Sequence, residues 1–335
     1  MRGSIEMTQS RRLLLKSLAG LAASMAVTLC IIWLFNIPLT SLLTTPLPLL
    51  LLSIVICMAR HVAQGLRLYL LVKRHSKTSF GLVKALVTRN VSEFFALTTI
   101  PFLADELVRV WILVEVGERP ATAFWIAFSE LILDVLVGSP IAMLAGLAAL
   151  AHGDIYLAAI LLIISVTQLA LTIFLIMLPK LQSITRFGLM ERFPIPDRFL
   201  AQFKDFIRES SNFLTEFRSG WSKAVPAALL ALTLAVIMLP AATLYLVFSS
   251  YGSISFVEAV YAFHAGNALG VLPVMVGGSG LTEAGIYLFS SRILAIPSWS
   301  AVVIWRILTY YLSLLVSGIT LVFYTFWRAR RLLSK

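Results

Sequence analysis

The sequence is poor in charge. Asp, Glu, Lys and Arg make up only 13% of its 335 residues, whereas 59% are hydrophobic. A soluble domain carries about a quarter charged residues, so this composition excludes an ordinary soluble enzyme or binding module. Several apolar stretches exceed the roughly 18 residues that cross a bilayer core. The sequence therefore predicts an all-α polytopic membrane protein.

Cysteine is also scarce. Cys30 and Cys57 both lie in apolar stretches and form no C-x-x-C pattern, so the sequence offers no disulfide framework and no cysteine zinc site. It also has no Asp-x-Asp pair and no His-rich motif. We therefore expect neither a metal nor a cofactor.

A net charge of +11 first suggests a nucleic-acid partner, but the positions of the charges exclude one. The basic residues cluster at the amino terminus, from Arg67 to Arg89, from Lys180 to Lys223, and from Arg328 to Lys335. Basic clusters between apolar spans are typical of cytoplasmic loops. We therefore expect a multi-pass protein of the cytoplasmic (inner) membrane with both termini in the cytoplasm.

Six apolar stretches are long enough for full spans, at 15–36, 47–72, 121–150, 155–179, 224–249 and 299–327. The intervening connections at 37–46, 151–154 and 250–258 contain no Lys or Arg. We expect these three connections outside the cell.

Two further apolar regions, 80–118 and 256–296, are interrupted and too short for pairs of full spans. Each fits a re-entrant helical hairpin, and the two enter from opposite faces. The single membrane domain, 1–335, thus divides into a first half, 47–150, and an inverted second half, 224–327. Interrupted helices at corresponding places of inverted halves indicate a transporter's substrate site.

A basic linker, 180–223, joins the halves. Its Phe199, Phe203, Phe206 and Phe217 lie at helical spacing, which predicts an amphipathic helix. Such a helix lies either on the inner leaflet or over the cytoplasmic ends of the spans, and both alternatives stay open.

Charged residues also occur inside the predicted membrane regions, where each costs roughly 2.5–3.5 kcal/mol at a helix centre. Glu130 and Asp134 share a helix face, and we expect Arg109 or Arg306 to pair with them or with Glu283. Such pairs either only fix the packing of the halves or line a cavity for a charged headgroup. The candidate substrate-binding residues are Glu106, Arg109, Glu130, Asp134, His264, Asn267, Gly277, Gly278, Ser279, Gly280, Glu283 and Arg306.

The stretch GGSG, residues 277–280, breaks the second hairpin. Glycines permit a sharp turn, and the helix that follows directs its N–H groups at the break. We expect the backbone N–H groups of the GGSG turn to cradle a phosphate. We also expect Gly278→Leu to block lipid movement while leaving the fold intact.

Two enzyme alternatives remain. GGSG matches the Gly-x-Ser-Gly pattern of rhomboid-type serine proteases, with Ser279 as nucleophile, but no histidine follows His264. We therefore expect His264 and Asn267 to form a polar cavity wall. A membrane transferase acting on a phospholipid or polyprenyl-linked substrate, with an intramembrane carboxylate as base, is the stronger enzyme alternative.

Three motifs resemble the lysylphosphatidylglycerol synthase transmembrane-region family, a flippase-like domain. Pro101, Glu106 and Arg109 fit its Pro-x4-Glu-x2-Arg pattern, and Glu130 and Asp134 fit Glu-Arg-x-x-Asp. GGSGLTE at 277–283 fits Pro-Gly-Gly-x-Gly-x-x-Glu. Four residues depart from these patterns, which makes the chain a divergent member: Leu103, Asp105, Leu131 and Val276.

The resemblance implies a protein that moves a charged-headgroup lipid between leaflets. The lipid partner is expected to be an anionic or aminoacylated phospholipid, or a polyprenyl or hopanoid lipid. We expect transport rather than catalysis, and we expect Arg306→Ala to reduce lipid movement far more than expression.

Overall fold

The computed structural model describes residues 19–38, 40, 44–76, 80–99, 104–184, 205–206, 208–213, 215 and 224–333. Within these residues the regular structure is helical, and no strand is present. Helices satisfy every backbone hydrogen bond within the segment, which a bilayer core requires. The prediction of an all-α membrane protein is confirmed at this level.

Five helices are long and apolar enough to cross a membrane. They are α2 (Leu47–His75), α5 (Pro120–Ala151), α6 (Ile155–Ile184), α8 (Ala224–Phe248) and the continuous run of α11 (Trp299–Arg306), η4 (Ile307–Tyr311) and α12 (Leu312–Leu333). These helices match five of the six predicted spans. The sixth corresponds to the shorter apolar helix Ala19–Leu34, and the start of that predicted span lies outside the described residues.

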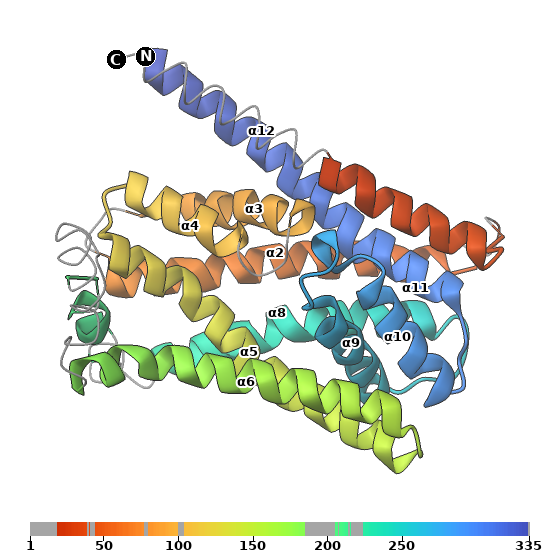
Figure 1. Ribbon diagram of the computed structural model, residues 1–335. Helices are drawn as coiled ribbons and strands as arrows, with labels where there is room; N and C mark the ends of the chain where they lie inside the picture. Colours follow the sequence, from red (N-terminus) through yellow and green to blue (C-terminus); the bar gives the residue numbers. More distant parts are fainter. Residues whose placement is uncertain are drawn as a thin grey trace.

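Two pairs of shorter helices pack against the long ones (Figure 1). The first pair is α3 (Leu82–Thr98) and α4 (Ala104–Glu115); the second is α9 (Phe256–Gly270) and α10 (Leu281–Arg292). The short helix η3 (Val276–Gly278) lies between α9 and α10. Both regions are thus interrupted as the sequence predicts, whereas Pro101 and the rest of the first break lie outside the described residues.

Ion pairs and hydrogen bonds show which connections share an end of the molecule. Arg292, the last residue of α10, pairs with Asp154 in the α5–α6 turn at 3.1 Å, and the Thr44 hydroxyl donates to Tyr251 at 2.7 Å. We call this the neutral end. At the opposite, basic end, Arg328 of α12 pairs with Glu115 of α4.

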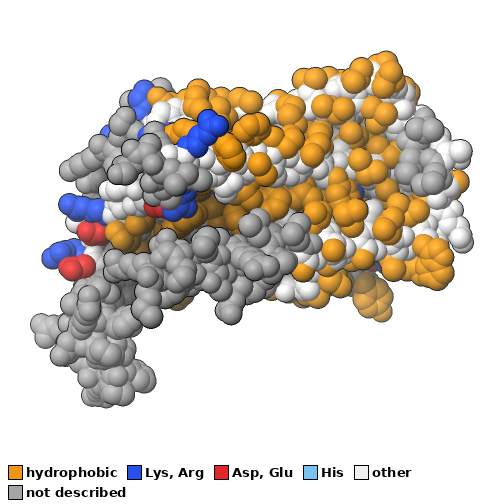
Figure 2. Space-filling model, turned by 90° about the horizontal axis from the view of Figure 1, so that it is seen from above, with side chains coloured by type: hydrophobic (Ala, Val, Ile, Leu, Met, Phe, Trp, Pro, Cys, Tyr) orange, Lys and Arg blue, Asp and Glu red, His pale blue; other side chains and the backbone are white. Residues whose placement is uncertain are grey.

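The exterior is apolar over most of the length of the molecule, and the visible charges gather at the basic end (Figure 2). The helix α6 is the most exposed of the long ones, with Ile155, Ile163 and Leu171 each more than 60% exposed. Such a broad apolar surface is not stable in water. It therefore faces lipid, and the chain is a multi-pass membrane protein.

The interior carries two main apolar clusters. One joins α5, α6, α8, α9, α10 and α11 around Leu161, Phe248 and Phe289; the other joins α2, α4 and α5 around Leu68 and Trp125. These clusters pack the helices against one another.

The linker between the halves is described only in part. Its Phe213 is buried beside Trp125 with ring centroids 6.3 Å apart, and Phe206 meets Phe124 edge-on at 5.5 Å. This portion therefore packs against α5, which favours a helix packed over the spans. The remainder of the predicted amphipathic helix lies outside the described residues.

Candidate functional site

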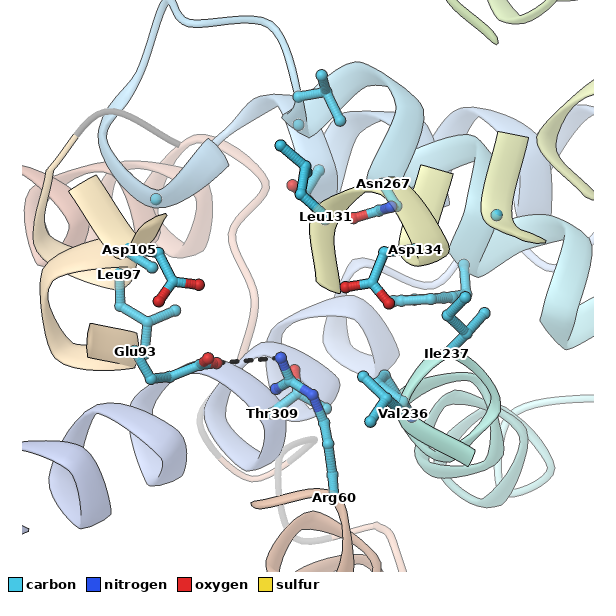
Figure 3. Close-up of a pocket in the computed structure, with 18 of the residues that line it drawn as sticks. Arg60, Glu93, Leu97, Asp105, Leu131, Asp134, Val236, Ile237, Asn267 and Thr309 are labelled. Carbon is cyan, nitrogen blue, oxygen red and sulfur yellow. Dashed lines mark hydrogen bonds and ion pairs between the residues drawn. The ribbon is translucent and has the colours of Figure 1, made fainter. Parts of the chain in front are cut away.

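A cavity of about 310 Å³ lies among helices of both predicted halves. In Figure 3 the carboxylates of Asp105 and Asp134 point toward one another across it, and Arg60 meets Glu93 on a third side. Its polar and charged lining comprises Arg60, Gln64, Arg89, Glu93, Asp105, Glu106, Arg109, Asp134, Ser139, Gln168, His264, Asn267, Thr282, Arg306, Thr309 and Tyr310. A charged cavity therefore exists inside an apolar molecule.

Arg67 of α2 lies at the centre of the charged network beside this cavity. Its guanidinium is fully buried and donates through Nε to Glu130 at 3.0 Å and through Nη2 to Asp134 at 3.0 Å. Glu130 and Asp134 lie one turn apart on α5, so one fork reaches both carboxylates. This cation joins α2 to α5.

Arg109 of α4 is the second buried cation. Its Nη2 atom lies 3.0 Å from Glu106 and 3.2 Å from Asp105, and Nη1 contacts Glu130. Glu130 therefore lies between the guanidinium groups of Arg67 and Arg109. The predicted pairing of Arg109 with Glu130 is confirmed.

Arg89 of α3 and Arg60 of α2 complete the network. Arg89 pairs with Glu93 at 2.9 Å and with Asp105 at 3.2 Å, while Arg60 pairs with Glu93 at 3.0 Å. Sequence reasoning assigned the region from Arg67 to Arg89 to a cytoplasmic loop. That assignment is wrong for Arg67 and Arg89, which are buried among helices.

The sequence contained a pattern that could have predicted the burial of these arginines. Arg60 and Arg67 lie seven residues apart inside an apolar stretch, a spacing that places both on one face of a helix. Two cations on one face of a span need buried partners. The same reasoning also identifies Arg89 and Glu93, which are four residues apart on α3.

The network holds four guanidinium groups and five carboxylates, and most of their surface is inaccessible. The exceptions are the side chains of Asp134, 35% exposed, and Arg60, 21% exposed. Because an unpaired buried charge is costly, the inner charges must stay paired, and this fixes how their helices pack. Asp134 and Arg60 remain available to a molecule in the cavity.

The GGSG break is a tight turn. Gly277, Gly278 and Gly280 have φ of 55°, 68° and 84°, in the region that favours glycine. Its N–H groups donate to Thr99 O (Gly277), Met275 O (Gly278), Val276 O (Ser279) and a Glu283 carboxylate oxygen (Gly280). The expectation of an open backbone cradle is therefore wrong, since all four donors are used internally.

Arg306 holds this turn in place. Its Nε lies 2.9 Å from the Glu283 carboxylate, and its Nη2 donates to Ser279 Oγ at 2.8 Å and to Gly277 O at 3.1 Å. The guanidinium stacks over the Tyr310 ring at 3.8 Å. Arg306 immediately precedes the π-helical turn η4, and such turns are frequent at functional sites.

The turn is also attached to neighbouring helices. Ser279 Oγ lies 2.6 Å from Ser24 Oγ on the N-terminal helix, and the Tyr310 hydroxyl donates to Leu97 O of α3 at 2.5 Å. Within the described residues Ser279 makes no hydrogen bond to His264. The serine–histidine dyad of the protease alternative is therefore not assembled.

His264 and Asn267 lie three residues apart on α9 and both line the cavity, as expected of a polar wall. His264 is only 2% exposed, and its Nε2 has no hydrogen-bond partner among the described residues. Asn267 is exposed.

The cavity brings together only part of the predicted set. It is lined by Glu106, Arg109, Asp134, His264, Asn267, Gly277 and Arg306, whereas Glu130, Gly278, Ser279, Gly280 and Glu283 lie behind its wall. Two departures from the family patterns, Asp105 and Leu131, also line it.

Comparison with known proteins identifies the family. No curated protein matches the chain. The family model described as the lysylphosphatidylglycerol synthase TM region matches residues 17–317. The match includes the charged network, the GGSG break and Arg306. This chain therefore belongs to the lysylphosphatidylglycerol synthase TM region family.

Proposed function

We propose that this protein moves a lipid with a charged headgroup between the two leaflets of the bilayer. The observation that carries the proposal is the charged cavity of about 310 Å³ inside an otherwise apolar molecule. A headgroup enters the cavity while its acyl chains stay in the lipid. Asp134 and Arg60, the two accessible charges of the network, contact the headgroup first.

The size of the charged network supports transport over a purely structural role. One buried ion pair would suffice to fix two helices, and such pairs add little net stability. Here nine charged side chains form one network, seven of them line the cavity, and two of these remain partly accessible. Intramembrane charges facing a cavity mark substrate pathways.

The helix arrangement supports a transporter with two inverted halves. We infer that α3–α4 and α9–α10 are re-entrant hairpins from opposite faces, and that 47–150 and 224–327 are the halves joined by the linker 180–223. Gly277 N–H donates to Thr99 O, so the second break contacts the end of α3. The second break thus lies against the end of α3 beside the cavity, the place where inverted-repeat transporters bind substrate.

The basic end is assigned to the cytoplasm and the membrane to the inner membrane, because basic connections stay inside. The candidate lipids remain anionic or aminoacylated phospholipids and polyprenyl or hopanoid lipids. The proposal requires no bond to be made or broken in the lipid and no cofactor.

A vesicle assay tests the proposal. The full chain is reconstituted in phosphatidylcholine vesicles with a trace of fluorescent phosphatidylglycerol, and lipid movement is read by quenching of the accessible leaflet. Asp134→Asn is expected to slow movement about tenfold, the ratio that a hydrogen bond to a charged group gives. Asp154→Asn, in the turn at the neutral end, is the matched control and should leave the rate unchanged.

Three outcomes decide the matter. Movement that depends on the protein and on Asp134 supports the proposal. Vesicles in which no fluorescent lipid moves contradict it. A change in lipid mass after incubation indicates the transferase alternative, since only covalent chemistry alters the mass.

A further inference from the structure

Four of the polar residues that line the cavity carry no formal charge and come from three helices: Ser139 on α5, Gln168 on α6, and His264 with Asn267 on α9. The Ser139 hydroxyl donates to Gln168 Oε1 at 3.2 Å. Gly138 lies against the His264 ring, since a Cβ added there would be 3.5 Å from Cε1. Because Gly138 and Ser139 are adjacent, His264 and Gln168 flank the same turn of α5.

These groups have unused hydrogen-bonding capacity. His264 Nε2 and Gln168 Nε2 are buried and have no hydrogen-bond partner among the described residues. A buried polar group without a partner costs free energy, so a site that retains two of them is complemented by something absent from the protein chain. Both side chains line the cavity, which places their missing partner there.

The chemistry of the missing partner follows from the donors and acceptors. The Gln168 amide nitrogen only donates, while the imidazole nitrogen of a neutral histidine donates or accepts. A hydroxyl group both donates and accepts, so it can form a hydrogen bond with either nitrogen. Asp134, the nearest accessible charge along α5, precedes Gly138 by one turn, or about 6 Å. That distance is the length of a glycerol or sugar unit beside a charged group.

We propose that His264, Gln168, Ser139 and Asn267 form a subsite for the free hydroxyl groups of a lipid headgroup. The inference rests on the proposed function, because that function makes a lipid headgroup the occupant of the subsite. It narrows the substrate to lipids that bear free hydroxyl groups. The hydroxyls belong either to a glycerol or to a sugar, and the two sources share the same hydrogen-bonding chemistry.

Matched lipids test the subsite. Purified full chain is mixed with equal amounts of phosphatidylglycerol and phosphatidylpropanol, which share charge and acyl chains but differ in free hydroxyls. Bound lipid is counted by native mass spectrometry. Phosphatidylglycerol is expected to be preferred about fivefold, the ratio of one net hydrogen bond. A parallel mixture of glucosyl diacylglycerol with plain diacylglycerol tests the sugar source.

Two variants and a control locate the effect. His264→Leu removes the ring nitrogens, and Gly138→Leu fills the space beside the ring; each should bring the preference to about one. His152→Leu makes the same substitution on an exposed residue of the α5–α6 turn and should leave it unchanged. A preference in only one mixture identifies glycerol or sugar as the source.

Equal binding in both mixtures overturns the subsite, as does a preference that survives both variants. The same lipids in the vesicle assay separate this result from the transport proposal. A hydroxyl preference in binding without any lipid movement supports the subsite and contradicts transport. Lipid movement without a hydroxyl preference in binding supports transport and contradicts the subsite.

Discussion

Arg67 on α2 and Asp134 on α5 face each other with two guanidinium nitrogens toward two carboxylate oxygens, and Nη2 lies 3.0 Å from Oδ2. Arg67 is fully buried, whereas the Asp134 side chain is 35% exposed toward the cavity. The pair thus joins the buried network to the accessible site. Removing its two members should have different consequences, because Arg67 keeps Glu130 as a partner when Asp134 is lost.

Arg67→Leu should destabilise the protein strongly. The substitution leaves Glu130 and Asp134 without their shared cation, and breaking a buried pair from one side costs about 3–5 kcal/mol. Unfolding in mixed micelles measures the loss. Arg208→Leu removes an arginine from an exposed pair with Asp205 and should cost less than about 1 kcal/mol. Equal losses in the two variants would show that the buried network contributes no more than a surface pair.

Arg306→Ala should lower stability as well as lipid movement. The sequence alone suggested a selective loss of movement, but the structure shows Arg306 bonded to Gly277 O, Ser279 and Glu283. Glu283→Gln retains an acceptor for Gly280 N–H while it removes the charge. A double-mutant cycle of the two positions should give a coupling of about 0.5–3 kcal/mol. Additive effects would contradict the ion pair.

Gly278→Ala should disrupt the turn itself. A Cβ at this position would lie 2.9 Å from Gly270 O, and its φ of 68° costs a residue with a side chain roughly 1–2 kcal/mol. The earlier expectation that Gly278→Leu spares the fold is therefore not supported by this geometry. Gly81→Ala meets no atom within 4 Å and is the matched control. Equal thermal stability of both variants would argue against the tight turn.

Ser279 should not react as a nucleophile. Its hydroxyl is 2.6 Å from Ser24 Oγ and accepts from Arg306, and no histidine bonds to it among the described residues. A fluorophosphonate probe should therefore leave the purified protein unlabelled, and Ser279→Ala should only reduce stability, by about 1–3 kcal/mol. Labelling that disappears in Ser279→Ala would restore the protease alternative.

Much of the helix pattern could be predicted from the sequence. The predicted spans at 47–72, 121–150, 155–179, 224–249 and 299–327 all coincide with long helices, because apolar length is a local property. The interruption at GGSG could also be predicted from a short stretch of sequence, because several glycines close together favour a turn. Family membership followed from short motifs such as Glu130 with Asp134.

The charge pairing could not be predicted in the same way. The sequence identified Arg109 and Glu130 but offered several partners for each, and it assigned Arg67 and Arg89 to a loop. From the sequence alone, a cation near the end of a span fits a loop residue and a buried residue equally well. Only the packing of α3 and α4 against α2 and α5 distinguishes the two.

By itself the sequence determined that the chain is a helical membrane protein, where most of its spans lie, and that the GGSG stretch interrupts an apolar region. Tertiary structure alone decided which charges are buried together, that the GGSG N–H groups are used internally, and that His264 faces a cavity. The physical reason is the distance along the chain over which each kind of interaction acts. Hydropathy and backbone preference act over a few residues, whereas an ion pair such as Arg67 with Asp134 joins positions that only packing brings into contact.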